Sequence, residues 1–229
     1  MTSSFQARCQ PLGERAVLLD FPGTPPSLDL QQRLWRLREQ VLARHDELHV
    51  TADCVPGMGN LCWVFDPDRL DSASACARLL KLWQAVCDKP LPASTRGRLV
   101  EVPVHYGGEA GPDLADVARH HGLPPRELVR LHSEAEYRVF FLGFLPGFAY
   151  LAGLPEALHT PRRATPRTAV PAGSVGIGGA QTGVYPCTSP GGWQLIGRTE
   201  LRLFDADAQP PTLLQPGDRL RFVVERCDV

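Results

Sequence analysis

The sequence predicts an α+β protein of two domains, and three observations indicate that class. Residues 16–87 alternate strand-like runs with two stretches of helical spacing. From residue 137 onward, short apolar runs are separated by glycine and proline turns, a pattern typical of a sheet. The segment 88–98, DKPLPASTRGR, is nearly free of apolar side chains and has the composition of a linker. We therefore expect a small α/β domain at residues 1–90 and a β-rich domain at residues 91–229.

The N-terminal domain is expected to run in the order strand, helix, strand, strand, helix. Alternating apolar residues predict the first strand at 16–21, and Ser27 is a suitable N-cap for the helix after it. Strands at 48–55 and 61–65 follow, joined by a Pro-Gly turn, and helical spacing returns at 70–87. The residues expected on the core-facing sides of the two helices are Leu30, Leu34, Leu37 and Val41, then Ala73, Ala77, Leu80 and Trp83.

The C-terminal domain is expected to be mostly sheet, with two short helices near its beginning. A strand at 99–106 precedes a helix at 113–121, which Gly122 ends, and a second helix begins at Pro124-Pro125. Many short strands separated by turns favour a barrel or a sandwich over a parallel sheet. The strands are expected at 137–142, 170, 175–177, 193–196, 201–204 and 220–224.

Composition excludes several classes of protein. The 24 lysines and arginines nearly balance the 25 aspartates and glutamates, so no overall charge attracts nucleic acid or an anionic membrane. Residues 1–10 lack the apolar core of a signal peptide, and no apolar run reaches the roughly 18 residues that a membrane span needs. The seven cysteines are scattered without a CxxC pair, which suits reduced thiols rather than disulfides or a metal site. We expect a cytoplasmic protein.

The segment 157–199 contains no aspartate, glutamate or lysine but four arginines, Arg162, Arg163, Arg167 and Arg198. Guanidinium groups bind carboxylates and phosphates through paired hydrogen bonds, so this cluster predicts a pocket for a small anion. The alternative is that the arginines pair with carboxylates from distant segments. The spacing leaves both interpretations open.

Glycines and neutral polar residues fill the same segment. No GxxxxGK[ST] motif occurs and no helix is expected after the glycines, so barrel turns account for them better than a phosphate loop does. The run AGSVG resembles a serine nucleophile elbow, but without a following helix the Ser174 hydroxyl suits a hydrogen bond to a ligand better. Gln181, Thr182 and Tyr185 could orient an amide or satisfy turns.

Two features lie before this segment. His132 closes the second short helix, where it could act as a general base or stabilise the helix end. The run FFLGFLPGFAYL at 140–151 predicts a buried strand followed by a bend, whose aromatic residues could pack in the core, line a pocket or form an interface.

Three blocks carry a resemblance to a known family. They are HSEAEYRVFFLGFLPGFAYLAGLPE at 132–156, PRRATPRTAVPAGSVGIGGAQTGVYP at 161–186 and SPGGWQLIGRT at 189–199. With GERAVLLDF and VPGMGNLCWVFDP near the N-terminus, they closely resemble the family of 5-oxoprolinase B subunits, also called the kinase A inhibitor or allophanate hydrolase subunit 1 family. The resemblance implies a small α/β domain followed by a cyclophilin-like β-barrel.

The resemblance also implies an activity and partners. Family members act beside an A subunit, and beside a carboxyltransferase-like C subunit, in the ATP-dependent opening of 5-oxo-L-proline to L-glutamate, with Mg²⁺ expected to accompany ATP. The isolated chain is expected to show little turnover. Two alternatives remain open: a regulatory protein that inhibits a sensor histidine kinase, and a subunit of an allophanate, urea or biotin-dependent carboxyltransferase system.

Because 5-oxoproline carries a carboxylate and its activation by ATP produces phosphorylated species, the resemblance makes the arginines candidate ligands. In this hypothesis Arg162, Arg163 and Arg198 bind the carboxylate or phosphoryl oxygens. Gln181 and Tyr185 orient the lactam. The full set of site residues expected is His132, Arg163, Gln181 and Tyr185 for catalysis, and Arg162, Arg167, Ser174, Thr182 and Arg198 for substrate binding.

Overall fold

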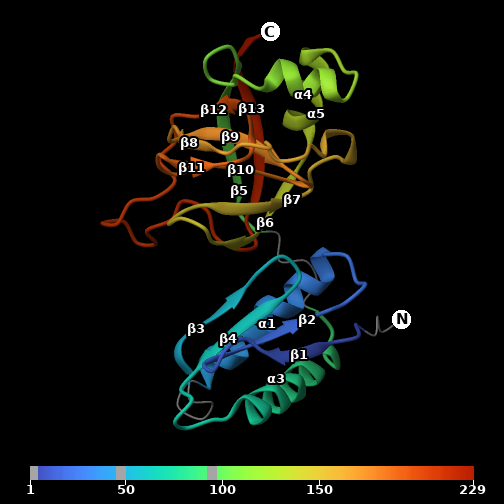
Figure 1. Cartoon of the computed structure of the whole chain (residues 1–229), viewed down its shortest axis with the longest axis vertical. Helices are drawn as coiled ribbons and strands as arrows, with labels where there is room; N and C mark the ends of the chain where they lie inside the picture. Colours follow the sequence, from blue (N-terminus) through green and yellow to red (C-terminus); the bar gives the residue numbers. More distant parts are fainter. Residues whose placement is uncertain (1–4, 45–49, 92–96) are drawn as a thin grey trace. The chain divides into compact units, whose positions relative to one another are not determined.

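The computed structural model describes residues 5–44, 50–91 and 97–229. The chain divides into two compact units, Met1–Thr95 and Arg96–Val229, each with helices and a sheet of its own (Figure 1). Part of the predicted linker, 92–96, and the start of the predicted strand at 48–55 lie outside the described residues.

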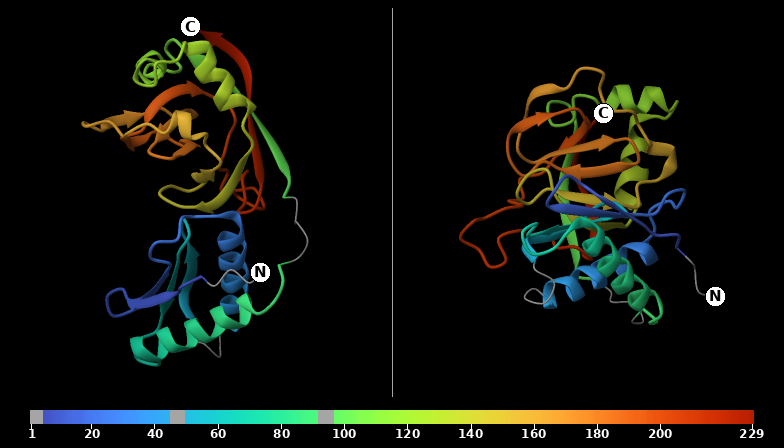
Figure 2. Two further views of the ribbon diagram at one scale, coloured as in Figure 1. Left: turned by 90° about the vertical axis from the view of Figure 1, so that its right-hand side faces the viewer. Right: turned by 60° about the horizontal axis from the view of Figure 1, so that its bottom comes forward.

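The N-terminal unit is built on a four-stranded antiparallel sheet. Its strands are β1 (Arg8–Pro11), β2 (Ala16–Asp20), β3 (Val50–Pro56) and β4 (Leu61–Phe65). They lie in the order β1-β2-β4-β3. Burial alternates along β2 and β4, so one face of the sheet carries the core and the helices pack there (Figure 2).

The first helix, α1 (Leu28–Ala43), forms as the spacing predicts. The Ser27 hydroxyl accepts a hydrogen bond from the Leu30 amide at 3.2 Å, which satisfies a free donor of the first turn. The four predicted core residues of this helix are fully buried. The amphipathic pattern therefore identified the correct face.

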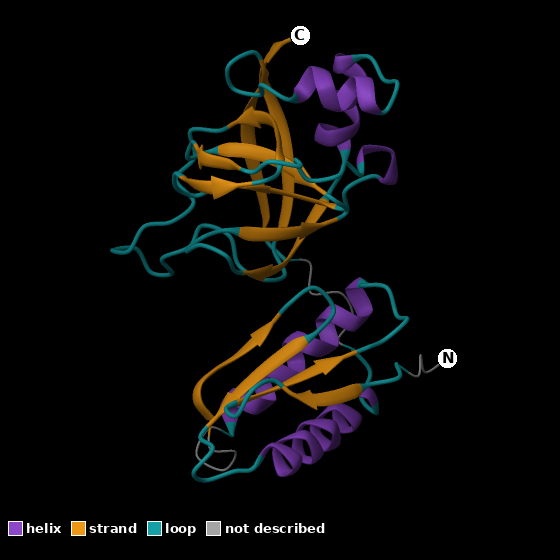
Figure 3. Cartoon of the chain, in the orientation of Figure 1, coloured by secondary structure: helices purple, strands orange, loops and turns teal. Residues whose placement is uncertain are grey.

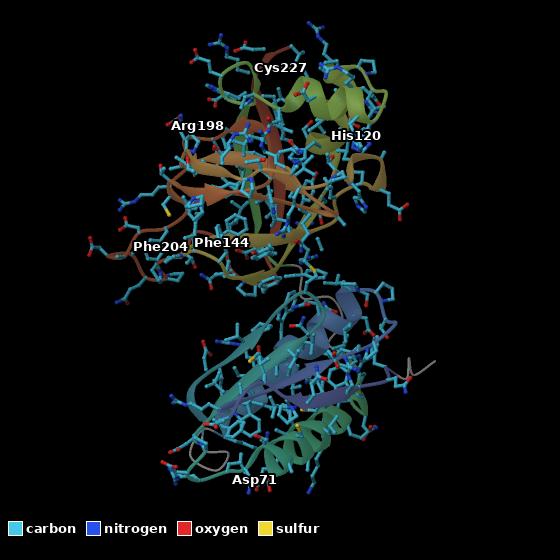
Figure 4. The ribbon with its side chains drawn as sticks, in the orientation of Figure 1. Asp71, His120, Phe144, Arg198, Phe204 and Cys227 are labelled. Carbon is cyan, nitrogen blue, oxygen red and sulfur yellow. The ribbon has the colours of Figure 1, made fainter. Side chains whose placement is uncertain are left out.

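For the next helix, α3 (Ser72–Cys87), the predicted core face was right at Trp83 and Leu80 and wrong at the two alanines. Its buried residues are Ala75, Leu79, Trp83 and Val86, whereas Ala73 and Ala77 are exposed. Alanine carries too little apolar surface to decide which side of a helix packs, and the leucine, tryptophan and valine side chains decide it here. Asp71 caps this helix by accepting a hydrogen bond from the Ser74 amide at 2.9 Å (Figure 4).

The C-terminal unit is a closed seven-stranded barrel in the order β10-β7-β6-β13-β5-β12-β9 (Figure 3). Its strands are β5 (Leu99–Gly107), β6 (Tyr137–Leu142), β7 (Ala149–Ala152), β9 (Ser174–Gly178), β10 (Gln181–Val184), β12 (Gln194–Arg198) and β13 (Arg219–Asp228). A separate pair, β8 (Arg167–Val170) and β11 (Ser189–Gly191), lies beside the barrel. The expected α+β class, with an α/β unit followed by a barrel, is confirmed.

Strand predictions in this unit were right at the long strands and wrong at one short run. The segment 201–204 is no strand; Phe204 forms only an isolated bridge with Thr212. The terminal strands β5 and β13 pair in parallel, which brings the two ends of the unit together and closes the barrel. Strands β7, β10 and β11 were not predicted, because each is only three or four residues long and such runs carry little periodicity.

Three helical segments, α4 (Leu114–His120), α5 (Pro125–Glu134) and the short 3₁₀ helix η1 (Glu156–Leu158), cover one side of the barrel core (Figure 3). Leu128 and Val129 of α5 are buried among barrel residues. None of the helices in the described segments has the length and apolarity that crossing a bilayer requires.

Candidate functional site

A pocket of about 250 Å³ opens on the C-terminal unit, and half of its lining residues are aromatic. We call it the aromatic pocket. The residues that define it are Phe144, Phe148, Tyr150, Arg162, Tyr185 and Trp193. They come from the bend between β6 and β7, from β7, and from loops next to β8, β10 and β12, so the pocket exists only in the folded barrel.

Edge-to-face contacts hold the buried aromatic rings in place. The Phe148 ring centroid lies 5.4 Å from that of Tyr185 and 5.5 Å from that of Trp193, with interplanar angles of 78° and 74°. Such T-shaped pairs are favourable because the positive ring edge meets the negative ring face. These three side chains form a small cluster apart from the main barrel core, with Val170 and Leu195. These contacts fix the three buried rings of the pocket wall.

The bend between β6 and β7 carries an aromatic residue in an unusual conformation. Phe144 has φ of 67° and leaves 60% of its surface exposed. A large side chain in the left-handed region is strained, and strain of this kind concentrates at functional sites. The neighbouring Gly147, with φ of 83°, is required because a Cβ atom there would lie 2.9 Å from the Cβ of Phe204. The bend thus holds Phe144 at the rim of the pocket.

Three polar groups belong to the aromatic pocket. Burial raises the pKa of Tyr185, while a backbone hydrogen bond from Trp193 and the charge of Arg162 act in the opposite direction. Burial also raises the pKa of Tyr150, again opposed by Arg162. Both phenols are therefore protonated at neutral pH and can donate hydrogen bonds. The guanidinium of Arg162 is close enough to influence both of them electrostatically.

Two of the predicted arginines share one carboxylate. Arg163 Nη1 lies 3.1 Å and Arg167 Nη2 lies 2.8 Å from Asp113 Oδ1. The other oxygen of Asp113 accepts a hydrogen bond from the Leu195 amide at 2.6 Å. Arg163 and Arg167 therefore pair with a carboxylate from a distant segment, as the second of the two interpretations expected. One aspartate cannot neutralise two guanidinium groups, so a positive charge remains.

A second pocket, of about 300 Å³, lies next to this cluster. We call it the polar pocket. The residues that define it are Asp116, His120, Thr160, Arg162, Arg163 and Ala164. Arg162 therefore lines both pockets.

Arg198, Ser174 and Gln181 line neither pocket. Arg198 is exposed at the end of β12, with Nε 4.0 Å from Glu200 Oε1, and it lies apart from Phe144 and His120 (Figure 4). Ser174 is buried at the start of β9, where its carbonyl accepts a hydrogen bond from the Tyr185 amide. The structure does not bring these three residues to Arg162, so their substrate contacts stay predictions.

His132 and Thr182 form a network inside the barrel. His132 Nε2 lies 2.9 Å from Thr182 Oγ1, and Nδ1 lies 2.8 Å from Tyr106 Oη. Thr182 Oγ1 donates to the Gly176 carbonyl, so it accepts from the Nε2–H of His132, whose Nδ1 then accepts from Tyr106.

Burial lowers the pKa of His132 to about 3, so the imidazole is neutral. Its ring also stacks on Phe222 with centroids 4.5 Å apart. Neither His132 nor Thr182 lines the aromatic or the polar pocket. Their position indicates a role in ordering the barrel interior rather than contact with a ligand.

The glycine-rich segment does not fit ATP. Residues 174–184 form the β9–β10 hairpin, in which Gln181 pairs with Gly178 and Gly183 with Gly176. No helix follows to direct free amide groups at a phosphate, as a nucleotide loop requires. Within the described residues, no group of three or more histidine, cysteine, aspartate or glutamate side chains could hold a metal ion.

Of the residues that line the aromatic pocket, the sequence predicted Tyr185 and Arg162 as site residues, but not the other aromatic side chains. It did not predict Asp113 either. Asp113 lies 50 residues before Arg163, and nothing in the spacing links them. The aromatic residues had a signal, since the run at 140–151 was expected to pack in the core, line a pocket or form an interface. For Trp193 the sequence carried no signal of a place in the pocket wall, because this residue was predicted only as part of a strand.

The chain matches a known protein family and is similar to known proteins over almost its whole length. The family described as carboxyltransferase domain, subdomain C and D, matches residues 7–214. The chain is 49% identical to the 5-oxoprolinase B subunit of Escherichia coli O157:H7, over 96% of this chain and 97% of that protein. It is 50% identical to the 5-oxoprolinase B subunit of Haemophilus influenzae, over 96% and 98% respectively.

Among solved structures, the crystal structure of TTHA0988 in space group P212121 matches with a TM-score of 0.74 and 40% sequence identity. The match covers 93% of this chain but 40% of that longer chain.

Proposed function

The chain belongs to the family of 5-oxoprolinase B subunits, and from that premise we propose that it serves as the B subunit of an ATP-dependent 5-oxoprolinase, which opens 5-oxo-L-proline to L-glutamate. The observation that carries the proposal for the site is the aromatic pocket with Arg162 at its edge. 5-Oxoproline is a small lactam ring with apolar methylene groups, a carboxylate and an amide. The pocket has a complement for each.

The aromatic wall suits the ring. Phe148 and Trp193 are buried and fixed, so they can contact the methylene groups without losing side-chain freedom. Arg162 is exposed and can pair with the carboxylate through two parallel hydrogen bonds. A pocket of about 250 Å³ suits a small ring better than a nucleotide.

The two tyrosines suit the lactam. Because burial raises the pKa values of Tyr150 and Tyr185, both hydroxyl groups keep their protons and can donate to the lactam carbonyl. Donation to a carbonyl oxygen stabilises the negative charge that develops there when the carbon is attacked. In this proposal Tyr185 orients and polarises the lactam, as its position in the sequence suggested.

Other polypeptides complete the enzyme in this proposal. ATP supplies the phosphoryl group that activates the lactam, and the glycine-rich hairpin of this chain does not fit it, so we assign ATP and its Mg²⁺ to a partner. We propose that the partners are proteins like the A subunit of 5-oxoprolinase and like its carboxyltransferase-like C subunit. The relatives' designation as B subunits supports partner polypeptides in general.

Reconstitution tests the proposal. The chain mixed with the A and C subunits is expected to form glutamate and to hydrolyse ATP in a 5-oxoproline-dependent manner, whereas the chain alone is not. Arg162→Gln is expected to raise KM for 5-oxoproline about tenfold, because it removes a charge-assisted hydrogen-bonded pair. Arg126→Gln is the matched control, since Arg126 is exposed on α5 and lines neither pocket.

Three outcomes would contradict the proposal. Robust 5-oxoproline hydrolysis by the lone chain would show that the site is not shared. An unchanged KM in Arg162→Gln would remove the aromatic pocket as the substrate site. Turnover that needs urea or biotin, or suppression of histidine kinase autophosphorylation, would favour the alternative functions.

A further inference from the structure

The polar pocket carries more positive than negative charge. Arg163 lines the pocket and shares the carboxylate of Asp113 with Arg167, which does not itself line the pocket. Among the residues that the structure describes, no hydrogen-bond partner reaches the buried atoms Arg163 Nε and Arg167 Nη1. The carboxylate of Asp116 also lines the pocket, but Arg119 neutralises it at 2.6 Å. Arg162 adds a further cation.

The remaining polar groups of the pocket are not all free to bind a ligand. Thr160 Oγ1 donates to the Leu158 carbonyl and lies 2.9 Å from His121 Nε2, so its hydroxyl is occupied. Gln194 Nε2 donates to the Pro161 carbonyl, which fixes the loop that carries Arg162 and Arg163. The charged and aromatic groups that line the pocket and remain for a ligand are therefore the guanidinium groups of Arg162 and Arg163 and the ring of His120.

We propose that the polar pocket binds a small tetrahedral oxyanion of the phosphate class. A carboxylate is planar, carries a single negative charge and is satisfied by one guanidinium fork. A phosphate group carries between one and two negative charges at neutral pH and presents more acceptor oxygens. Two guanidinium groups with an imidazole beside them suit the phosphate better.

Arg162 connects this pocket to the aromatic pocket. In 5-oxoproline, the carboxylate and the lactam carbonyl sit on the two carbons that flank the ring nitrogen. A phosphoryl group on the lactam oxygen would then lie close to the carboxylate, and a single guanidinium could face both. The phosphoryl group of an activated lactam is one source of the anion, and free inorganic phosphate is the other. The first source rests on the proposed function, whereas the site itself does not.

Titration of the full-length chain with inorganic phosphate, followed by calorimetry at constant ionic strength, tests the site. Ala164 is exposed and lines the polar pocket but not the aromatic pocket, so it allows a selective change. Ala164→Glu places a negative charge beside the proposed anion and is expected to weaken phosphate binding about fivefold or more. Ala164→Gln has the same shape without the charge and is expected to change affinity less than about twofold.

Arg162→Gln is expected to weaken phosphate binding about tenfold, and Arg126→Gln to leave it unchanged. Absence of saturable phosphate binding to the unmodified chain, or equal losses in Ala164→Glu and Ala164→Gln, would overturn the proposal. Assay of the Ala164 variants in the reconstituted complex separates the two sources. A kcat lower in Ala164→Glu than in Ala164→Gln identifies the activated lactam, and an equal kcat with weakened phosphate binding identifies free phosphate.

The site and the proposed function fail separately. Saturable phosphate binding with no 5-oxoprolinase activity in the reconstituted complex would reject the function and keep the site. Activity of the reconstituted complex without phosphate binding to the chain would reject the phosphate site and keep the function.

Discussion

Buried polar side chains in this protein depend on partners that lie far away in the sequence. His132, on α5, is fully buried and bonded at both ring nitrogens to residues of two barrel strands, Tyr106 and Thr182. A buried imidazole without such partners would be destabilising, and a charged one more so. The barrel therefore holds His132 neutral.

This arrangement predicts how stability depends on pH. The pKa of His132 is about 3 in the folded chain, against an ordinary value of 6.5. Between these values the unfolded chain binds a proton that the folded chain does not, so stability present above pH 6.5 is lost as pH falls toward 3. The contribution is up to about 1.4 kcal/mol per pH unit.

The measurement is denaturant unfolding at several pH values. The free energy of unfolding of the unmodified chain is expected to fall more steeply between pH 6 and pH 4 than that of His132→Gln, by about one kcal/mol per unit. Glutamine keeps an amide donor and acceptor but does not titrate. Equal slopes for the two proteins would show that His132 is not buried in its neutral form.

At the scale of elements, the end of β11 and the turn that follows it shape the aromatic pocket. A Cβ atom added to Gly191 would lie 2.6 Å from Tyr185 Oη, whereas one added to the next residue, Gly192, would lie 3.7 Å from its nearest neighbour, Pro166. The first distance requires the tyrosine to move, and the second is an ordinary van der Waals contact. Two adjacent glycines therefore give a matched pair of variants.

Gly191→Ala is expected to displace Tyr185, to lower stability by about 1–3 kcal/mol and to weaken 5-oxoproline binding about tenfold. Gly192→Ala is expected to stay within about 0.5 kcal/mol of the unmodified chain. Thermal unfolding and calorimetric titration of 5-oxoproline measure both effects. Similar behaviour of the two variants would mean that this turn does not position Tyr185.

At the scale of the whole molecule, the chain has separate cores in its two units. The residues of the N-terminal core, among them Leu34, belong to one cluster, and those of the barrel, among them Leu128, belong to another. Both leucines are fully buried. Loss of packing in one unit should therefore leave packing in the other intact.

Leu34→Ala is expected to destabilise the N-terminal unit by about 2–5 kcal/mol, because it creates a cavity in a fully buried site. In NMR spectra recorded during heating, amide signals of the N-terminal unit are expected to disappear first, while those of the barrel persist. Leu128→Ala is expected to reverse that order. Simultaneous loss of all signals in both variants would show that the two units unfold as one.

The sequence by itself determined the fold class and much of the element pattern. Strands such as β5, and the helix with Leu30, Leu34, Leu37 and Val41, follow from local periodicity, because burial on one side leaves a pattern in consecutive residues. Glycine-rich turns and the arginine cluster were also visible locally. The resemblance to the family was also visible in the sequence, because it rests on long blocks of consecutive residues.

Only the tertiary structure decided which of those residues meet. Asp113 pairs with Arg163 and Arg167, and His132 bonds to Thr182 inside the barrel. Arg162 lines both pockets and Arg198 lines neither, although all four arginines share one stretch of sequence. Charge pairing and pocket formation depend on distances across the closed barrel, and barrel closure pairs Leu99 with Arg219, which lies 120 residues later in the sequence. Local sequence carries no record of those distances.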